Sequence, residues 1–287
     1  MKKFISVLIA FVTFISFASL NVFAATYFQY KNFIFESYSD KTCKIIDYVG
    51  SEEDVVVPDE LIGDDVVSLA FGAFMDKTDI KTVTLPNTLT TMENAVFTRS
   101  YNLASVNIPA NCTTIGSSIF QDCISLRNVV IESNLTVITR QMFLNCASLE
   151  EITLPATVET IDRFAFRGCI SLKSITIPKS TTNIASNAFM DCPNLTIRGY
   201  VGSYAQQFAT DYNIPFEPIN DYMLGDVDLD GEITIYDVTT LQKYLADITT
   251  LTSEQLSVCD VNKDGSIGID DATTIQKYLA DVILSFD

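Results

Sequence analysis

The sequence predicts an α/β-type repeat solenoid with a parallel β-sheet, followed by a small all-α domain. Two observations lead to this prediction. A phenylalanine recurs at one fixed interval from Phe74 to Phe189, and several other apolar positions keep the same interval. Near the end of the chain, an acidic loop followed by a short helical segment occurs twice, starting at Asp226 and again at Asp260. Fixed self-similarity of this kind is typical of proteins built from stacked units.

The first residues have the composition of an export signal. Lys2 and Lys3 precede an apolar run from Phe4 to Leu20, and small residues follow up to Ala24. We therefore expect residues 1–24 to be a secretory signal peptide. A retained membrane anchor is the alternative, because the apolar run approaches the length of a membrane span. The first interpretation predicts a secreted, extracellular protein that is not inserted in a membrane after cleavage.

The composition excludes several kinds of site. The chain has no histidine and no tryptophan, which excludes histidine acid–base catalysis, Ser-His and Cys-His nucleophiles and histidine-ligated zinc. Its net charge is −18, and residues 221–287 hold 14 acidic residues against three lysines. An acidic chain without basic clusters is not suited to nucleic acid. It is suited to cations.

The repeat region consists of apolar columns with a common period. The phenylalanine column is Phe74, Phe97, Phe120, Phe143, Phe166 and Phe189. A second column is Leu69, Met92, Ile115, Ile138, Ile161 and Ile184, and a third is Ile80, Leu103, Leu126, Leu149, Leu172 and Leu195. A period between about 20 and 29 residues with leucine and isoleucine columns is the pattern of a leucine-rich solenoid. Each repeat is too small to bury its own apolar face, so the coils stack around one shared core.

Each repeat also predicts one short strand. In segments such as "LEEITLP", apolar and polar residues alternate, which is typical of a strand with one buried face. Proline follows four of these strands (Pro86, Pro109, Pro155 and Pro178) and ends each one because it has no N–H to donate. Glu132 departs from this pattern. We expect the strands to lie about 4.8 Å apart, as a parallel sheet along one side of the solenoid.

The repeats resemble the BspA-like class of bacterial leucine-rich repeats. Residues 161–178, "IDRFAFRGCISLKSITIP", carry the motif of that class. The resemblance covers residues 27–219 and implies an N-terminal cap over 25–65, repeats over 66–198 and a C-terminal cap over 199–219. In the C-terminal cap, one helix face is expected to cover the last coil with Tyr204, Ala205, Phe208 and Ala209.

Four cysteines form another column at the 23-residue interval. Side chains stacked from coil to coil point in parallel, whereas a disulfide needs facing Cβ atoms about 3.8 Å apart. A straight column also cannot surround one metal ion tetrahedrally. We therefore expect Cys123, Cys146, Cys169 and Cys192 to be small apolar residues inside the solenoid. The sequence does not predict the redox state of Cys43 and Cys259.

The outward positions of the predicted strands carry no recognisable catalytic group. They are small and mostly uncharged, and two carboxylates in register, as glycoside hydrolysis needs, are missing. This face is therefore either a solvated surface or a docking surface for a protein, cell-surface or polysaccharide ligand that the sequence does not identify. We predict that the chain is not an enzyme.

Residues 226–237 and 260–271 are two copies of one acidic loop. Carboxylate or amide side chains stand at positions 1, 3, 5 and 12, and glycine stands at position 6. Calcium takes about six to eight oxygen ligands, and alternate residues of a tight loop direct such oxygens inward. The backbone carbonyls of position 7 would complete each set. The predicted ligands of two Ca²⁺ ions are Asp226, Asp228, Asp230, Glu232 and Asp237, and Asp260, Asn262, Asp264, Ser266 and Asp271.

A short helix is expected after each loop. Val238, Leu241 and Leu245 share one face in the first copy, and Ala272, Ile275 and Leu279 do so in the second. We expect these faces to pack the two copies together. No amphipathic helix of similar length precedes either loop, so each copy is half an EF-hand.

This pair of half EF-hands resembles a type I dockerin over residues 225–284. The resemblance implies a calcium-folded module over 225–287, after a linker at 220–224, that binds a cohesin domain of a scaffoldin, as in cellulosomes. The resemblance also implies that the cohesin is contacted by loop positions 10 and 11 and by the outer face of the helix that follows. Here these positions are Ile235, Tyr236, Gln242, Lys243, Ile269, Asp270, Gln276 and Lys277.

Together these features predict a secreted, non-catalytic protein that displays a leucine-rich repeat domain on a bacterial cell-surface scaffold. Two alternatives stay open. One is a dockerin-borne enzyme or accessory of polysaccharide catabolism with an unrecognised activity, and the other is an adhesin or substrate-targeting module.

Overall fold

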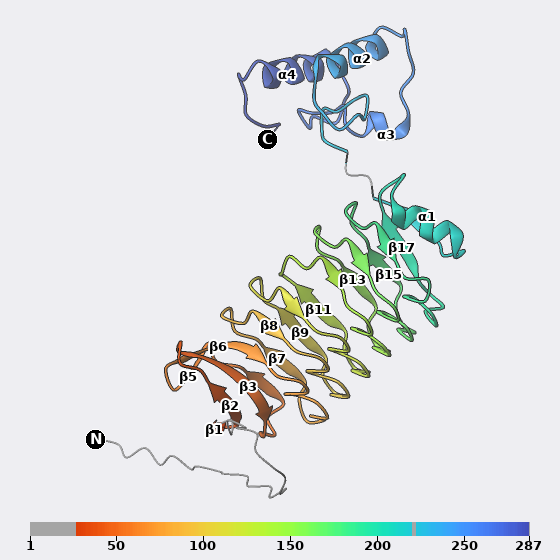
Figure 1. Ribbon diagram of the computed structural model, residues 1–287. Helices are drawn as coiled ribbons and strands as arrows, with labels where there is room; N and C mark the ends of the chain where they lie inside the picture. Colours follow the sequence, from red (N-terminus) through yellow and green to blue (C-terminus); the bar gives the residue numbers. More distant parts are fainter. Residues whose placement is uncertain (1–26, 220–221, 287) are drawn as a thin grey trace, which may run out of the picture. The chain divides into compact units, whose positions relative to one another are not determined.

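The computed structural model describes residues 27–219 and 222–286, which form two compact units divided between Pro218 and Ile219. The predicted signal peptide lies outside the described residues. The first unit is a stack of similar coils that succeed one another along the chain, and the second is a small helical unit (Figure 1). No helix in the described ranges is long and apolar enough to cross a membrane.

An antiparallel hairpin begins the first unit. β1 (Tyr27–Tyr30) pairs with β2 (Phe33–Ser37), and β2 pairs with β3 (Thr42–Tyr48). β3 then pairs in parallel with β6 (Asp64–Leu69), and β5 (Glu60–Leu61) adds to β6 in antiparallel orientation. This hairpin covers the first coil, whose apolar edge would otherwise face water.

The following coils carry strands on two sides. The longer set is β4 (Asp54–Val56), β7 (Thr82–Thr84), β9 (Ser105–Ile108), β11 (Asn128–Ile131), β13 (Glu151–Thr153), β15 (Ser174–Thr176), β17 (Thr196–Gly199) and β18 (Phe216–Pro218). The shorter set is β8 (Thr91–Met92), β10 (Thr114–Ile115), β12 (Val137–Ile138), β14 (Thr160–Ile161) and β16 (Asn183–Ile184). The parallel pairing along one side is as predicted, and the second, shorter set of parallel strands was not predicted. Strands of two residues are too short to show an alternating pattern in the sequence.

The stack of strands is interrupted once on each of these sides. The longer strands form two sheets, β11-β9-β7-β4 and β13-β15-β17-β18, and the shorter strands also stop pairing between β10 and β12. This interruption falls at the coil in which Glu132 stands where other coils have proline. On the third side the same two coils stay joined, because Phe120 N–H donates to Met142 O at 2.9 Å and Asp122 N–H to Leu144 O at 2.8 Å.

The core of the solenoid is the predicted set of columns. The six phenylalanine rings are buried and stack on one another, with centroids 5.1–5.5 Å apart. Cys123, Cys146 and Cys169 are also buried, and each thiol donates to the carbonyl of a phenylalanine in the preceding coil. Burial raises the pKa of the Cys146 thiol well above its ordinary value. These three cysteines therefore lie in the interior, as predicted, whereas Cys192, in the last coil of the column, is only partly buried.

Helix α1 (Tyr204–Asp211) lies against the last coils of the solenoid. Ser203 caps the helix by accepting a hydrogen bond from Gln206 N–H. Ala205, Phe208 and Ala209 are buried, and the ring of Phe208 meets Phe189 edge-on at 6.0 Å. Tyr204, which was predicted to share this face, is instead 42% exposed. Tyr204 shares a helix face with Phe208 by spacing, but it is the first residue of α1 and lies at the open end of that face.

The second unit consists of two similar helices and one short helix. These are α2 (Ile235–Leu245), α3 (Ser253–Leu256) and α4 (Ile269–Leu279). Its core of fully buried apolar residues is Val227, Val238, Leu241, Cys259, Val261, Ala272 and Ile275. Leu245 packs partly buried against this core, but Leu279 is 36% exposed at the end of α4, contrary to the prediction. Helix α3, a single turn before the second loop, was not predicted.

Candidate metal centres

The first loop gathers three carboxylates. Asp226, Asp228 and Asp237 each place one carboxylate oxygen within 4.8 Å of the others. Asp226 is 2% exposed and Asp237 is fully buried. None of the ion pairs formed by the described residues involves these side chains. Buried carboxylates without a cation are costly, so the chemistry of this cluster fits a bound metal ion.

Backbone N–H groups hold these carboxylates in position. Asp226 accepts from Asp230 N–H at 3.1 Å and Gly231 N–H at 3.0 Å. Asp237, in the first turn of α2, accepts from Asp228 N–H at 3.0 Å and Thr234 N–H at 2.7 Å. Gly231 has φ +94°, which glycine adopts without the strain that a side chain would cause. Each carboxylate oxygen has a second lone pair, so these contacts leave capacity for a cation.

The charges in the first loop repel one another. Burial, followed by the neighbouring carboxylates of Asp237 and Asp230, raises the pKa of the Asp228 carboxyl. Both effects disfavour the ionised form of Asp228. A divalent cation at this position would reverse the local preference, since it favours ionised oxygen ligands.

The second loop repeats the same backbone arrangement. Asp260 accepts from Asp264 N–H at 3.1 Å and Gly265 N–H at 3.0 Å. The buried Asp271 accepts from Asn262 N–H at 3.3 Å and Gly268 N–H at 2.8 Å, as Asp237 does from the equivalent residues, and also from Val261 N–H at 2.9 Å. The two loops are therefore close structural copies in their first and last acidic positions.

The middle of the second loop differs from the first. Asn262 replaces an aspartate, and its amide donates to Asp264 at 3.1 Å and to Asp270 at 2.9 Å. The Ser266 hydroxyl also donates to Asp264, and this hydrogen bond lowers the pKa of the Asp264 carboxyl. In the described part of the chain, the close group of three acidic oxygens occurs in the first loop alone.

Three other predicted ligands, Asp230, Glu232 and Ser266, lie in the loops but outside the group of three close carboxylates. Asp230 is exposed and accepts from Glu232 N–H at 2.9 Å. Glu232 and Ser266 are exposed loop residues, and the role predicted for their carbonyls stays a prediction. Thr234 is the N-cap of α2 and accepts from Tyr236 N–H at 3.1 Å.

All eight residues predicted to contact a cohesin are exposed, as a docking surface requires. Ile235 is 57%, Tyr236 70% and Ile269 64% exposed. Sequence reasoning missed two further exposed apolar residues, Ile248 at 73% and Val282 at 69%. Val282 follows Ile248 at the interval that separates the two loops, so the same repeat could have identified them.

Two protein-family models match the chain. One describes a BspA type leucine rich repeat region and matches six copies over residues 66–196. The other describes a dockerin type I domain and matches residues 224–280. A comparison with curated proteins gives no match.

The fold also resembles solved structures of bacterial proteins. A leucine-rich repeat protein of T. pallidum (TpLRR) is 27% identical, with a TM-score of 0.57 and coverage of 65% of this chain and 95% of that one. A leucine-rich repeat protein of Eubacterium ventriosum is 22% identical, with a TM-score of 0.53 and coverage of 59% of this chain and 44% of that one. The second similarity concerns the fold alone.

Proposed function

The chain carries a BspA-type leucine-rich repeat region and a type I dockerin domain, and we propose that it is a secreted, non-catalytic protein that docks on a scaffoldin and displays its solenoid there. Type I dockerins bind calcium and cohesins, so the chain is a cohesin-binding component of the cellulosome type. The duplicated acidic loop is the observation that carries this proposal.

We propose one calcium ion in each loop. The ligands would be those predicted from the sequence, with Asp226, Asp228 and Asp237 at the centre of the first set and Asp260 and Asp271 in the second. Bound calcium supplies the positive charge that these carboxylates lack. The chain's own contribution is the ring of backbone N–H donors that orients each carboxylate, and the start of a helix at position 10 of each loop.

The cohesin would bind the exposed start and outer face of α2 or of α4. Ordering of each loop fixes the first turn of the helix that follows, because Asp237 and Asp271 belong to both loop and helix. Loss of calcium is therefore expected to disturb the exposed residues Ile235 and Ile269 together with the loops. Ile248 and Val282 add apolar area of the kind that protein interfaces bury at their centres.

The non-catalytic role is supported by the types of module and by the composition. Leucine-rich repeats and dockerins are non-catalytic module types. The absence of histidine from the sequence removes the commonest general base. The solenoid would then act by binding a protein or surface ligand, while the caps at 25–65 and 199–219 close its ends. Export would depend on residues 1–24.

The proposal is tested by calcium-dependent capture on an immobilised type I cohesin. We expect the full chain to bind in calcium and to be released by EDTA. The double substitution Asp226→Asn with Asp260→Asn keeps side-chain size but removes one charge from each loop. Because metal affinity depends on ligand charge, we expect this variant to lose capture at calcium concentrations that saturate the unchanged chain.

A matched control is Asp247→Asn with Asp281→Asn. These exposed aspartates are separated by the same interval as Asp226 and Asp260, but they follow the helices and lie outside the loops. Both have φ near +54°, a conformation that asparagine tolerates. The control should bind as the unchanged chain does. Equal capture by the loop variant and the control would contradict the calcium-dependent proposal, and hydrolysis of polysaccharides by the purified chain would contradict the non-catalytic one.

A further inference from the structure

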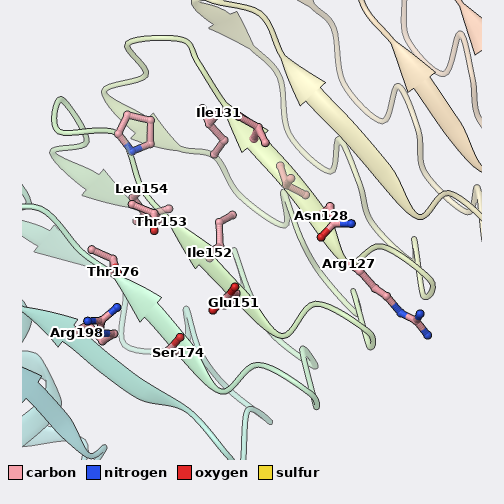
Figure 2. A pocket seen from close by; sticks show the side chains of 13 residues that line it. Arg127, Asn128, Ile131, Glu151, Ile152, Thr153, Leu154, Ser174, Thr176 and Arg198 are labelled. Atoms are coloured by element: carbon pink, nitrogen blue, oxygen red, sulfur yellow. The ribbon is translucent and has the colours of Figure 1, made fainter.

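The interruption between β11 and β13 opens a groove in the solenoid. Its volume is about 480 Å³, which is within the usual range of binding pockets. Figure 2 shows Asn128 and Ile131 on one strand and Glu151, Ile152 and Thr153 on the next. No aromatic side chain lines the groove, so it lacks the stacking platform that a sugar ligand would use.

The backbone on both sides of the groove presents unused strand edges. Asn128 N–H donates to Ala104 O at 3.2 Å and Glu132 N–H to Ile108 O at 3.0 Å, both in the preceding coil. Because successive residues of a strand direct their N–H and C=O groups to opposite sides, Val129 and Ile131 direct theirs toward β13. β11 pairs with β9 and has no strand partner on this side among the described residues.

The opposite strand has the complementary arrangement. Ser174 N–H of β15 donates to Glu150 O at 3.4 Å, and Leu154 N–H donates to Thr176 O of β15 at 3.0 Å. The backbone groups of Glu150 and Leu154 therefore point toward β15. Glu151 and Thr153 therefore direct their N–H and C=O groups toward β11. β13 pairs with β15, and within the described ranges its other edge is unpaired.

We propose that this groove binds one extended strand of a partner protein, which pairs with β11 on one side and with β13 on the other. A peptide backbone supplies alternating donors and acceptors to both edges, as in other complexes formed by strand addition. This inference deepens, and rests on, the proposed role of the solenoid as a binding domain.

The side chains of the groove indicate what the inward residues of the partner strand should be. Val129 and Ile131 are partly exposed, whereas their counterparts one coil earlier, Val106 and Ile108, are 3% and 0% exposed. Ile152, on the β13 side of the groove, is 5% exposed. An aliphatic residue at the inward positions of the incoming strand would cover the exposed parts of Val129 and Ile131, as the columns do elsewhere in the solenoid.

Two charged residues that line the groove, Arg127 and Glu151, form no ion pair with the described residues. Lys173 pairs with Glu150 at 2.5 Å and Arg198 pairs with Glu217 at 3.4 Å. Arg127 is exposed and forms no ion pair with the described residues. It precedes β11, so a strand that runs parallel to β11 would place its N-terminal end beside this guanidinium. We infer an acidic residue at that end.

The experiment uses a peptide that copies a strand of the solenoid itself. The peptide Leu-Glu-Glu-Ile-Thr-Leu-Pro repeats residues 149–155, with glutamates near its N-terminal end and isoleucine inside. It is added to the full chain in calcium, and amide hydrogen exchange is followed at Val129, Ile131, Glu151 and Thr153. We expect exchange at these amides to slow at least tenfold when the peptide is bound. The same peptide with N-methyl groups at two alternate residues should not protect them, because it cannot pair.

A charge reversal tests the orientation of the strand. Arg127→Glu should weaken binding of the peptide about tenfold, and a peptide with lysines in place of both glutamates should recover that loss. Arg140→Glu is the matched control, since Arg140 is exposed and does not line the groove. It should leave both affinities unchanged.

Several results would overturn the proposal. One is the absence of protection at about 1 mM peptide, a concentration that detects even weak binding. Others are equal binding of the N-methylated peptide, protection of the four amides by an oligosaccharide, or their protection by self-association of the chain without peptide. Cohesin capture is measured on the same samples. If the chain binds the cohesin but not the peptide, only the proposal for the groove is contradicted. If the chain does not bind the cohesin, the proposed docking function is contradicted.

Discussion

The two units are both built by repetition, but they repeat different things. The solenoid repeats apolar columns, and its continuous core extends from Phe33 in the hairpin to Ala209 in α1. The second unit repeats an acidic loop and shares a core of seven fully buried residues. A unit of about 65 residues with so few buried apolar side chains is marginal without an additional source of stability. We therefore predict that the solenoid folds independently of ions, whereas folding and metal binding are coupled in the second unit.

Removal of calcium should produce the largest difference in stability between the two units. In EDTA we expect the residues of α2 and α4 to lose their helical structure, because the buried carboxylates of Asp226, Asp237 and Asp271 then repel without compensation. The solenoid should keep its sheet signal. Circular dichroism during a chelator titration, with calorimetry at each end point, measures both transitions. A simultaneous loss of helix and sheet at one chelator concentration would show that the units are not independent.

A substitution in the phenylalanine column should destabilise the solenoid and leave the stability of the second unit unchanged. Phe143 is fully buried between Phe120 and Phe166, so Phe143→Ala should lower the free energy of unfolding of the solenoid by about 3–5 kcal/mol. Denaturant unfolding of the full chain in calcium should show this loss in the solenoid transition and no change in the helical one. The control is Phe71→Ala, because Phe71 is 62% exposed and its loss should cost far less. A similar cost at both positions would contradict a core centred on the column.

The solenoid could be predicted from the sequence because its strongest signal is periodic. A column such as that of Phe143 repeats at one interval, and the interval fixes which residues stack. Tyr204 and Leu279 were placed wrongly because each lies at the end of a short helix, where one position decides between a buried and an exposed face. Local pattern does not resolve such ends.

The groove between β11 and β13 could not be predicted in the same way. The column residues Val129 and Ile152 keep the repeat interval across it, so the pattern shows no break. Glu132, in place of proline, was a sign that this corner differs, but not that both strand sides would separate. The acidic loops were easier to predict, because the positions of Asp226 and Asp260 follow from the ligand spacing. What the spacing did not reveal is the difference in how the two loops gather their oxygens.

The two acidic loops of the second unit should also differ in calcium affinity, and this is the smallest effect that we expect. Asp228→Asn should lower the calcium affinity of the first loop about tenfold, or about 1.4 kcal/mol, because it removes one of three clustered carboxylates. Asn262→Asp should raise that of the second loop by a similar factor. It also removes the amide that donates to Asp264 and Asp270, so the calcium-free loop should become less stable. Calorimetric calcium titrations of both variants, with Asp247→Asn as control, should show the two affinities moving in opposite directions. If both substitutions lowered affinity equally, position 3 would act through hydrogen bonding alone, and the two loops would be equivalent as metal sites despite their different carboxylates.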